Sequence, residues 1–417
     1  MPPPPSCYGG AESAPSSSNQ HRQKRELPAI LELARPFLRG SWRRVGAGEC
    51  WHKHGSFLDH LVEVYRILKI WLAPDVVARC GLYHSAYSNS YVNLAIFDPA
   101  TSRDHVRDLI GGPAERFVHL FCIVPRQSLI HDDLLFRYAD AELTEHLELS
   151  EASVVNAMEK GIFDPEEPWR KKHIKTGEDV PISRRMVAAF LLMTMADFSD
   201  QLFGFQDALF DNADGRLAFS GNNYTALWPG NGKPGMWMNS ISRMGALYSL
   251  IVREEEIYLE EQKKKRPSED LLPERDEEIE LVIPPVFESC TKVLDVEDQS
   301  AARDLYWAAV CGVAGDEAEE PPLPRAERLL LACVEKNPFV GEPRLVLAQV
   351  YLGQERFPEA EAAAAVGLRL MLEWGSCWDK RMSWEGWIAW GRVLLMKAQE
   401  RSWPRSSWGI LNLGLVN

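Results

Sequence analysis

The apolar positions of this chain recur with the period of an α-helix over most of its length. Residues 57–72 show this best, because two apolar stripes run along one predicted helix. The first stripe contains Leu58, Leu61, Val62, Tyr65, Leu68 and Leu72, and the second contains Val64, Ile67 and Trp71 in line with His60. An apolar surface this wide predicts a helix that is buried on more than one side. Helical periods also follow in most later segments, so the sequence predicts an all-α fold.

A second helix follows after a short turn, and the pair brings two histidines together. Pro74 predicts the start of that helix, because proline suits the first helical position. The inward stripe of the second helix contains Val77, Cys80, Gly81 and His84. At about 1.5 Å per residue, His60 lies about 20 Å before the turn and His84 about 16 Å after it. A short connection favours an antiparallel pair, in which the two histidines end almost level.

A carboxylate on a later apolar helix is the third candidate residue. Residues 163–180 are charged and contain proline, so we expect a loop there. Ser183 then predicts the start of a long helix. Phe190, Met193, Thr194 and Asp197 recur at helical spacing, so Asp197 should face inward. A buried carboxylate is unfavourable unless it is paired or ligates something, so Asp197 is the most informative acid in the chain.

A charged segment divides the chain, and a repeat with a period of 34 residues follows it. Ala326, Leu330, Cys333 and Pro338 are followed 34 residues later by Ala360, Ala364, Gly367 and Leu372. This pattern resembles the tetratricopeptide repeat, which implies stacked helical hairpins and a protein partner. The predicted division is a disordered segment (1–25), an α-helical domain (26–260), a charged, solvated linker (261–284), a repeat-like helical domain (285–400) and a tail without an assigned role (401–417).

Composition and charge narrow the classes of function. The formal charge of −14 disfavours wide nucleic-acid binding, and no apolar run is long enough for a membrane span. The eight cysteines include no C-x-x-C pair, which is typical of reduced thiols in an intracellular protein. The Pro/Ser/Gly-rich N-terminus lacks a signal-peptide core. We therefore predict a cytoplasmic protein, with a plastid or mitochondrion as the alternative if the N-terminus is a transit peptide.

The order of the two histidines and the aspartate resembles a known superfamily. His60, His84 24 residues later, and Asp197 within MADFSDQ resemble the HD-domain superfamily of all-α metal-dependent phosphohydrolases. The layout is most similar to the hydrolase domain of stringent-response guanosine-tetraphosphate enzymes. The stretches HGSFLDHLVEVYRILK, CGLYHSAY and LWPGNGKPGMWMNSISRMGALY are still more similar to domain of unknown function 6817. The superfamily resemblance implies that His60, His84 and Asp197 bind one divalent metal such as Zn²⁺, Mn²⁺ or Fe²⁺.

The sequence departs from the superfamily at its acidic positions. Ser85 stands where the superfamily has an aspartate beside the second histidine, so the site loses a negatively charged ligand. Ser88 and Asn89 stand where the stringent-response enzymes carry a catalytic acidic pair. Two hypotheses stay open. The first is a metal-dependent hydrolase of a small phosphorylated metabolite or nucleotide. The second, which the missing acids favour, is a silent fold whose three residues only hydrogen-bond one another, in a protein that works through its repeats.

A glycine-rich loop adds two candidate residues for anion binding. Residues 230–235 read G-x-G-x-x-G, yet no predicted strand precedes them, which argues against a dinucleotide site. Lys233 and Arg243 are candidates for an anion-binding mouth near Asp197. A packed loop, stiffened by tryptophan and proline residues, is the alternative. Candidates for a fourth metal ligand are His52, His54 and His119, and the sequence does not choose among them.

Overall fold

A computed structural model describes most of the chain between Trp51 and Arg405. The described residues are 51–52, 55–87, 97, 102–126, 128–135, 138–148, 169–201, 210–211, 218–219, 234, 237–265, 279–284, 286–287, 293–311, 322–379 and 382–405. All of them belong to one compact unit, Ala47–Asn417. The predicted disordered segment (1–25) and most of the predicted tail lie outside the described residues.

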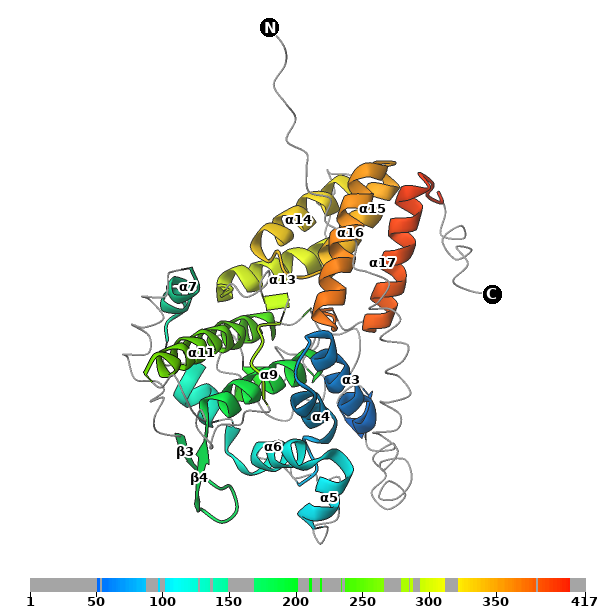
Figure 1. The fold of residues 1–417 in the computed structure, drawn as a ribbon. Helices are drawn as coiled ribbons and strands as arrows, with labels where there is room; N and C mark the ends of the chain where they lie inside the picture. Colours follow the sequence, from blue (N-terminus) through cyan, green and yellow to red (C-terminus); the bar gives the residue numbers. More distant parts are fainter. Residues whose placement is uncertain are drawn as a thin grey trace. The chain divides into compact units, whose positions relative to one another are not determined.

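Helices form nearly all of the regular structure in the described ranges, which confirms the all-α prediction (Figure 1). The helices are α3 (Phe57–Ile70), α4 (Asp75–Tyr83), α5 (Arg103–Ile110), α6 (Gly112–Ile123), the π-helix η2 (Ser128–Leu135), α7 (Asp140–Glu148), α9 (Arg184–Gln201), α11 (Trp237–Lys265), α13 (Val296–Cys311), α14 (Pro322–Lys336), α15 (Glu342–Gly353), α16 (Phe357–Trp374) and α17 (Trp384–Gln399). Three antiparallel strand pairs accompany them: β1 (Trp51–His52) with β2 (Gly55–Ser56), β3 (Trp169–Lys172) with β4 (Asp179–Ile182), and β5 (Phe210–Asp211) with β6 (Ala218–Phe219).

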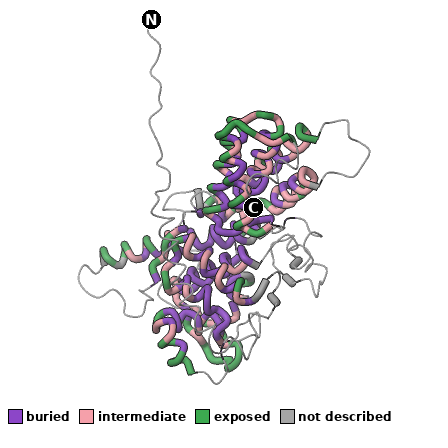
Figure 2. Tube along the Cα trace, turned by 90° about the vertical axis from the view of Figure 1, so that its right-hand side faces the viewer, coloured by how far each residue is buried: buried purple, intermediate pink, exposed green. Residues whose placement is uncertain are grey.

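Helix α9 is the buried centre around which the site-bearing helices pack. Every residue from Met186 to Ala196 is buried, so this helix is apolar on all sides. Helices α3, α4 and α11 contact it directly. Figure 2 shows the buried residues gathered in the interior and the exposed residues on the outside. A polar side chain on α9 is therefore held in a fixed, largely dry environment.

Residues that favour helix ends occupy three of them, and the start predicted at Pro74 is displaced by one residue. The Ser102 hydroxyl accepts the His105 N–H at 3.3 Å, and α5 ends at Gly111 with φ of 88°. The Ser183 hydroxyl accepts the Met186 N–H at 3.2 Å at the start of α9. Pro74 precedes α4 instead of occupying its first position, because the helix begins at Asp75.

The segment 163–180 was expected to be a loop, and that prediction is wrong for its described part. Strands β3 and β4 form a hairpin whose register runs from Trp169 opposite Ile182 to Lys172 opposite Asp179. The strand Trp169–Lys172 has the sequence WRKK, so it shows almost no apolar alternation. The hairpin is anchored to α6 by the Ile174 N–H, which donates to the Ile123 carbonyl at 2.9 Å.

The charged half of α11 also contributes to the core. Glu254 and Glu255 are buried, and they pair with Arg184 at 3.3 Å and Arg185 at 2.9 Å at the start of α9. Burial raises the pKa of Glu254 to about 7, although the charge of Arg184 lowers it. These ion pairs fix the two longest N-terminal helices against each other. A charged helical stretch in this chain is thus not always a solvated face.

The C-terminal helices α13 to α17 pack in chain order, each against the next (Figure 1). Positions of the 34-residue pattern are buried, including Leu330 and Cys333 on α14 and Ala360 and Ala364 on α16. Small residues at such positions allow neighbouring helices to approach closely. Assignment to the tetratricopeptide repeat, and a protein partner for these helices, stay predictions.

The predicted division into two domains also stays a prediction. Helix α11 continues to Lys265, and residues 266–278 lie outside the described residues. The end of the predicted linker packs against the N-terminal helices, since the Tyr248 hydroxyl donates to Val282 O and Arg185 donates to Ile279 O. Among the helices that the structure describes, none combines the length and the apolar composition that a bilayer span requires.

Candidate metal centre

The hairpin of α3 and α4 brings the two histidines together as the sequence predicts. His60 lies in the first turn of α3, and His84 follows the last residue of α4. Gly81 allows the close approach, because a Cβ there would lie 2.8 Å from Leu68 Cδ1. The two Nε2 atoms are 3.3 Å apart, and the rings meet edge to face with an interplanar angle of 84°. Both side chains are buried.

Asp197 completes a cluster of three residues. Its Oδ1 atom lies 3.2 Å from His60 Nε2, so the inward direction predicted for Asp197 is correct. One ligand atom from each of His60, His84 and Asp197 lies within 4.8 Å of the others. In the described part of the chain, no other group of His, Cys, Asp and Glu side chains has this spacing. The Asp197 side chain is 14% exposed, against 4% for His60, so the carboxylate is the more accessible side of the cluster.

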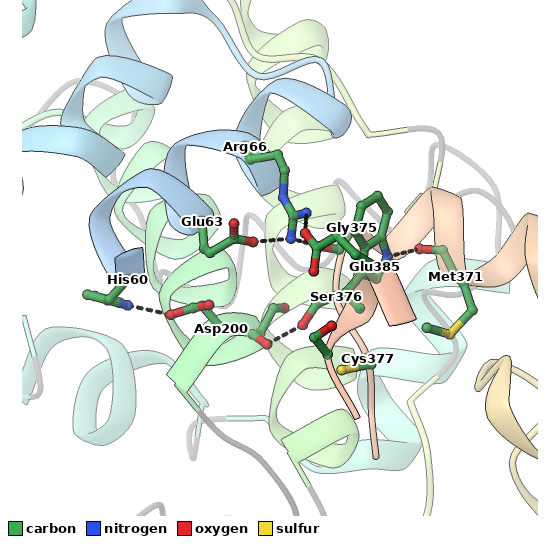
Figure 3. Close-up of polar contacts among 12 residues, drawn as sticks. His60, Glu63, Arg66, Asp200, Met371, Gly375, Ser376, Cys377 and Glu385 are labelled. Atoms are coloured by element: carbon green, nitrogen blue, oxygen red, sulfur yellow. Dashed lines mark hydrogen bonds and ion pairs between the residues drawn. The ribbon is translucent and has the colours of Figure 1, made fainter. Parts of the chain in front are cut away.

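The other ring nitrogen of each histidine is bound to an acceptor. His84 Nδ1 lies 2.8 Å from the Gly81 carbonyl oxygen, and His60 Nδ1 lies 2.6 Å from Asp200 Oδ2 (Figure 3). A carbonyl can only accept, so the Nδ1 atom of His84 carries a proton, and its Nε2 presents a lone pair when the ring is neutral. The Asp200 carboxylate likewise holds the Nδ1 proton of His60. Both rings are thereby oriented with Nε2 towards the centre of the cluster.

Asp200 was missed by the sequence analysis. It lies three residues after Asp197, so both side chains lie on one face of α9. The apolar spacing that identified Asp197 ends there, which is why the next acid in MADFSDQ received no role. A second carboxylate at i+3, beside a histidine expected nearby, was the available signal. Asp200 does not belong to the group of three ligand atoms and supports His60 from behind.

The electrostatics differ sharply between the two histidines. Burial lowers the pKa of His84 to about 4, so this ring is neutral at pH 7. Burial also lowers the pKa of His60, but hydrogen bonds to Asp197 and Asp200 outweigh it and raise the pKa to about 9. For Asp197, burial raises the pKa. The hydrogen bond to His60 and the charge of His60 lower it by more, so the pKa of Asp197 lies below the usual range. A proton and a metal ion would therefore compete for Nε2 of His60.

A buried arginine lies close to the cluster and was also missed. Arg126 is 1% exposed, and its Nε donates to the Phe121 carbonyl at 2.7 Å. Its guanidinium carbon lies 3.4 Å from the centre of the Phe121 ring, and the His84 ring also meets the Phe121 ring edge to face. The positive charge lowers the pKa of both His84 and Asp197. The sequence around it, IVPRQ, carries no periodic signal for a buried cation.

Of the remaining metal candidates, His119 is described with its side chain, and it does not join the cluster. Ser85, at the position where the HD-domain resemblance implies an aspartate, is buried beside His84. The ring of His119 packs against Tyr87 at 5.4 Å between centroids, and His119 is not among the three clustered ligands. His52 forms part of β1. The predicted positions that lie outside the described residues are His54, Ser88 and Asn89.

The predicted anion-binding mouth is only partly described. Lys233 lies outside the described residues. Arg243 is buried, and its Nη2 donates to the carbonyls of Leu135 at 2.6 Å and Tyr138 at 2.8 Å. Its Nε lies 2.7 Å from Asp140 Oδ1. Arg243 thus ties α11 to the end of η2 and the start of α7, and an anion-binding role for it stays a prediction.

Comparison with known proteins gives a family match that covers the histidine hairpin. No curated protein and no solved structure matches the chain. The family match described next tests neither the HD-domain resemblance nor the tetratricopeptide resemblance, and both stay predictions. Residues 41–126, which include His60, His84 and Arg126, match the family model described as a domain of unknown function (DUF6817).

Proposed function

We propose that His60, His84 and Asp197 bind one divalent metal ion, and that this is the primary function of the site. The observation that carries the proposal is the convergence of two imidazole nitrogens and one carboxylate oxygen within 4.8 Å. Ligands about 2.0–2.1 Å from a tetrahedral metal lie about 3.3 Å from one another. The separations of 3.3 Å and 3.2 Å from His60 Nε2 agree with that value. Imidazole with carboxylate suits Zn²⁺, Mn²⁺ or Fe²⁺.

Hydrogen bonding within the cluster explains the arrangement less well than a metal does. His84 Nε2 and Asp197 Oδ1 both approach the same nitrogen of His60. That nitrogen carries at most one proton, which cannot point fully at both acceptors. A metal ion accepts lone pairs from all three atoms at once. The orientation of each ring by Gly81 O and Asp200 is also the arrangement typical of metal-bound histidine.

A metal-dependent phosphohydrolase is the second candidate, and the local charge favours it. Asp197 and Asp200 contribute two negative charges, and Arg126 contributes one positive charge. A divalent ion beside a neutral His60 would leave the centre with one net positive charge, which attracts an anionic ligand such as a phosphoester. A bound divalent ion supplies Lewis-acid chemistry and a water of lowered pKa. Ser85 lacks the charge of an acidic ligand, so we rank hydrolysis below metal binding.

Metal content tests the primary proposal directly. The full chain, purified without chelators and reconstituted with Zn²⁺ or Mn²⁺, should hold about one ion per chain. His84→Ala should hold much less than one. His119→Ala is the matched control, because His119 packs on Tyr87 away from the ligand cluster and should keep full occupancy. Circular dichroism of each variant establishes that it is folded.

Two results would defeat the proposal. One is a folded wild type that binds no ion after reconstitution with either metal. The other is a folded His84→Ala variant that binds metal as tightly as the wild type. Hydrolysis is tested separately with p-nitrophenyl phosphate and with nucleotides. The second candidate expects metal-dependent phosphate release that disappears in His84→Ala, and it fails if the metal-loaded wild type releases none.

A further inference from the structure

The C-terminal helices contact α3 and α9, two of the helices that carry the candidate site. The contact is made by the connection between α16 and α17, here called the 375–379 turn (Gly375 to Asp379). The residues Ser376, Cys377, Trp378 and Asp379 are all buried. Figure 3 shows this turn between the end of α9 and helix α3, on the side of Asp200 that faces away from His60. A turn that is buried against both helices can influence their geometry.

On α9, the turn binds the residue next to Asp200. The Ser376 hydroxyl donates to the carbonyl oxygen of Ser199 (Figure 3). Ser199 lies in the last turn of α9, where carbonyl groups have no partner within their own helix. The hydrogen bond therefore fixes a backbone group that would otherwise be free to move at a helix end. Asp200 follows directly and holds Nδ1 of His60 at 2.6 Å.

On α3, the turn fits closely against the helix that carries His60. Gly375 has φ of 65°, and a Cβ on it would lie 2.9 Å from Ile70 Cδ1. Its carbonyl accepts from Arg66 Nη2 at 3.3 Å, and Arg66 also pairs with Glu385 at 2.5 Å. The Trp71 indole N–H donates to the Trp374 carbonyl at 3.2 Å. The turn thus contacts both α3, which carries His60, and α9, which carries Asp200.

The turn itself is held rigidly by the other C-terminal helices. Glu342 on α15 accepts the backbone N–H groups of Trp378 at 2.5 Å and Asp379 at 3.0 Å. The Tyr306 hydroxyl of α13 donates to Asp379 Oδ2 at 2.9 Å, and the Trp387 indole of α17 donates to the Asp379 carbonyl at 2.9 Å. Three C-terminal helices therefore determine where Ser376 lies.

We propose that Ser376 is a positioning residue of the metal centre, and that the C-terminal helices complete this centre instead of forming an independent module. The chain of contacts runs from Ser376 to Ser199 O, along the last turn of α9 to Asp200, and from Asp200 to Nδ1 of His60. The proposal rests on the metal site proposed above. Loss of the Ser376 hydroxyl should let the end of α9 move, weaken the contact between Asp200 and His60, and lower metal affinity.

The test compares two serine substitutions in the full chain. Ser376→Ala removes the contact with α9. Ser383→Ala is the matched control, because its hydroxyl accepts the Gly386 N–H at 3.1 Å and caps α17 without touching α9. Competition titration with Zn²⁺ should show about 10-fold weaker binding for Ser376→Ala, at the lower end of the effect of an outer-shell partner. Ser383→Ala should lower the temperature of unfolding and leave the Zn²⁺ affinity within twofold of the wild type.

A second readout separates this proposal from the metal site itself. The His60 Nδ1–H proton, held by Asp200, should give a downfield proton resonance in the metal-free chain, assigned by its loss in Asp200→Ala. Ser376→Ala should shift or broaden that resonance, and Ser383→Ala should not. An unchanged resonance and unchanged Zn²⁺ affinity in a folded Ser376→Ala variant would overturn the positioning role. If the wild type binds no metal, the proposed function fails, and the resonance alone then decides whether Ser376 positions Asp200.

Discussion

Two buried charged clusters in this protein have opposite arrangements of donors and acceptors. In the C-terminal helices, the carboxylate of Glu342 faces two backbone donors, Trp378 N and Asp379 N. In the N-terminal helices, a lone pair of His84 and a carboxylate oxygen of Asp197 face one nitrogen of His60. The first arrangement matches each acceptor with a donor, which is what a structural role requires. In the second, two acceptors share the single N–H of His60 Nε2, so they are not both matched by a donor, and this is the arrangement that the proposed metal ion would satisfy.

The comparison predicts that the two clusters fail in different ways when they are broken. Removal of a group from the Glu342 cluster should reduce folding stability, because buried donors lose their acceptor. Removal of a group from the His60 cluster should reduce metal affinity much more than stability.

The largest expected effect is that of Glu342→Ala on folding. Two buried N–H groups lose their acceptor and a cavity remains, so the free energy of unfolding should fall by about 4 kcal/mol. Urea denaturation of the full chain measures it. Glu335→Ala, on the exposed face of α14, is the control and should change stability by less than about 0.5 kcal/mol. If the free energy of unfolding falls by less than about 1 kcal/mol in Glu342→Ala, the structural role assigned to Glu342 is wrong.

Asp200→Asn should have the next largest effect, which is a loss of metal affinity. The amide oxygen can still accept from His60 Nδ1, but the charge that raises the basicity of the ring is lost. Outer partners of this kind contribute about 10–100-fold to metal affinity, so Zn²⁺ binding should weaken by that factor. Calorimetric titration measures the change, with the exposed Asp59→Asn on α3 as control. Equal affinities for the two variants would contradict the assigned role of Asp200.

The smallest expected effect is a pH dependence that originates in Glu342. Burial raises its pKa to about 7 from an ordinary value of 4.5, although the backbone N–H groups of Trp378 and Asp379 lower it. The folded chain then keeps a proton that the unfolded chain loses, so this contribution to stability is complete below pH 4.5 and is lost as the pH rises towards 7.

Glu342→Gln removes that titration and keeps an oxygen for the two N–H groups. Between pH 5.5 and 6.5, the wild type should lose about 1 kcal/mol more stability than Glu342→Gln. Urea titrations at both values give the difference, in which other titrating groups cancel. A difference of zero, or a wild type that gains stability relative to the variant, would show that the carboxyl group is ionised throughout this range.

Much of the N-terminal half could be predicted because its signals are local or periodic. The stripes of α3 and α4, together with the short turn at Pro74, were sufficient to place His60 level with His84. The inward position of Asp197 followed from the apolar spacing of α9. Asp200 and Arg126 were missed because their roles depend on tertiary contacts that periodicity does not describe. The hairpin of β3 and β4 was missed because β3 is charged on both faces and shows no apolar alternation.

The contact between the two halves could not be predicted from sequence. Ser376 and Ser199 are 177 positions apart, and each lies among residues without an obvious pattern. Gly375 resembles an ordinary glycine at the end of a helix, although its lack of a side chain is what admits Ile70 of α3. The buried ion pairs between α9 and α11 could not be predicted either. Glu254 and Glu255 belong to a run of charges that is typical of a solvent-exposed surface.

X-ray absorption of the Zn²⁺-loaded full chain is the most direct test of the proposed metal centre. We expect one Zn²⁺ per chain with two imidazole ligands at about 2.0–2.1 Å and the remaining ligands oxygen. His84→Ala should lose one of the two imidazole contributions. A spectrum with only oxygen ligands, or one that is unchanged in His84→Ala, would show that His60, His84 and Asp197 do not hold the metal.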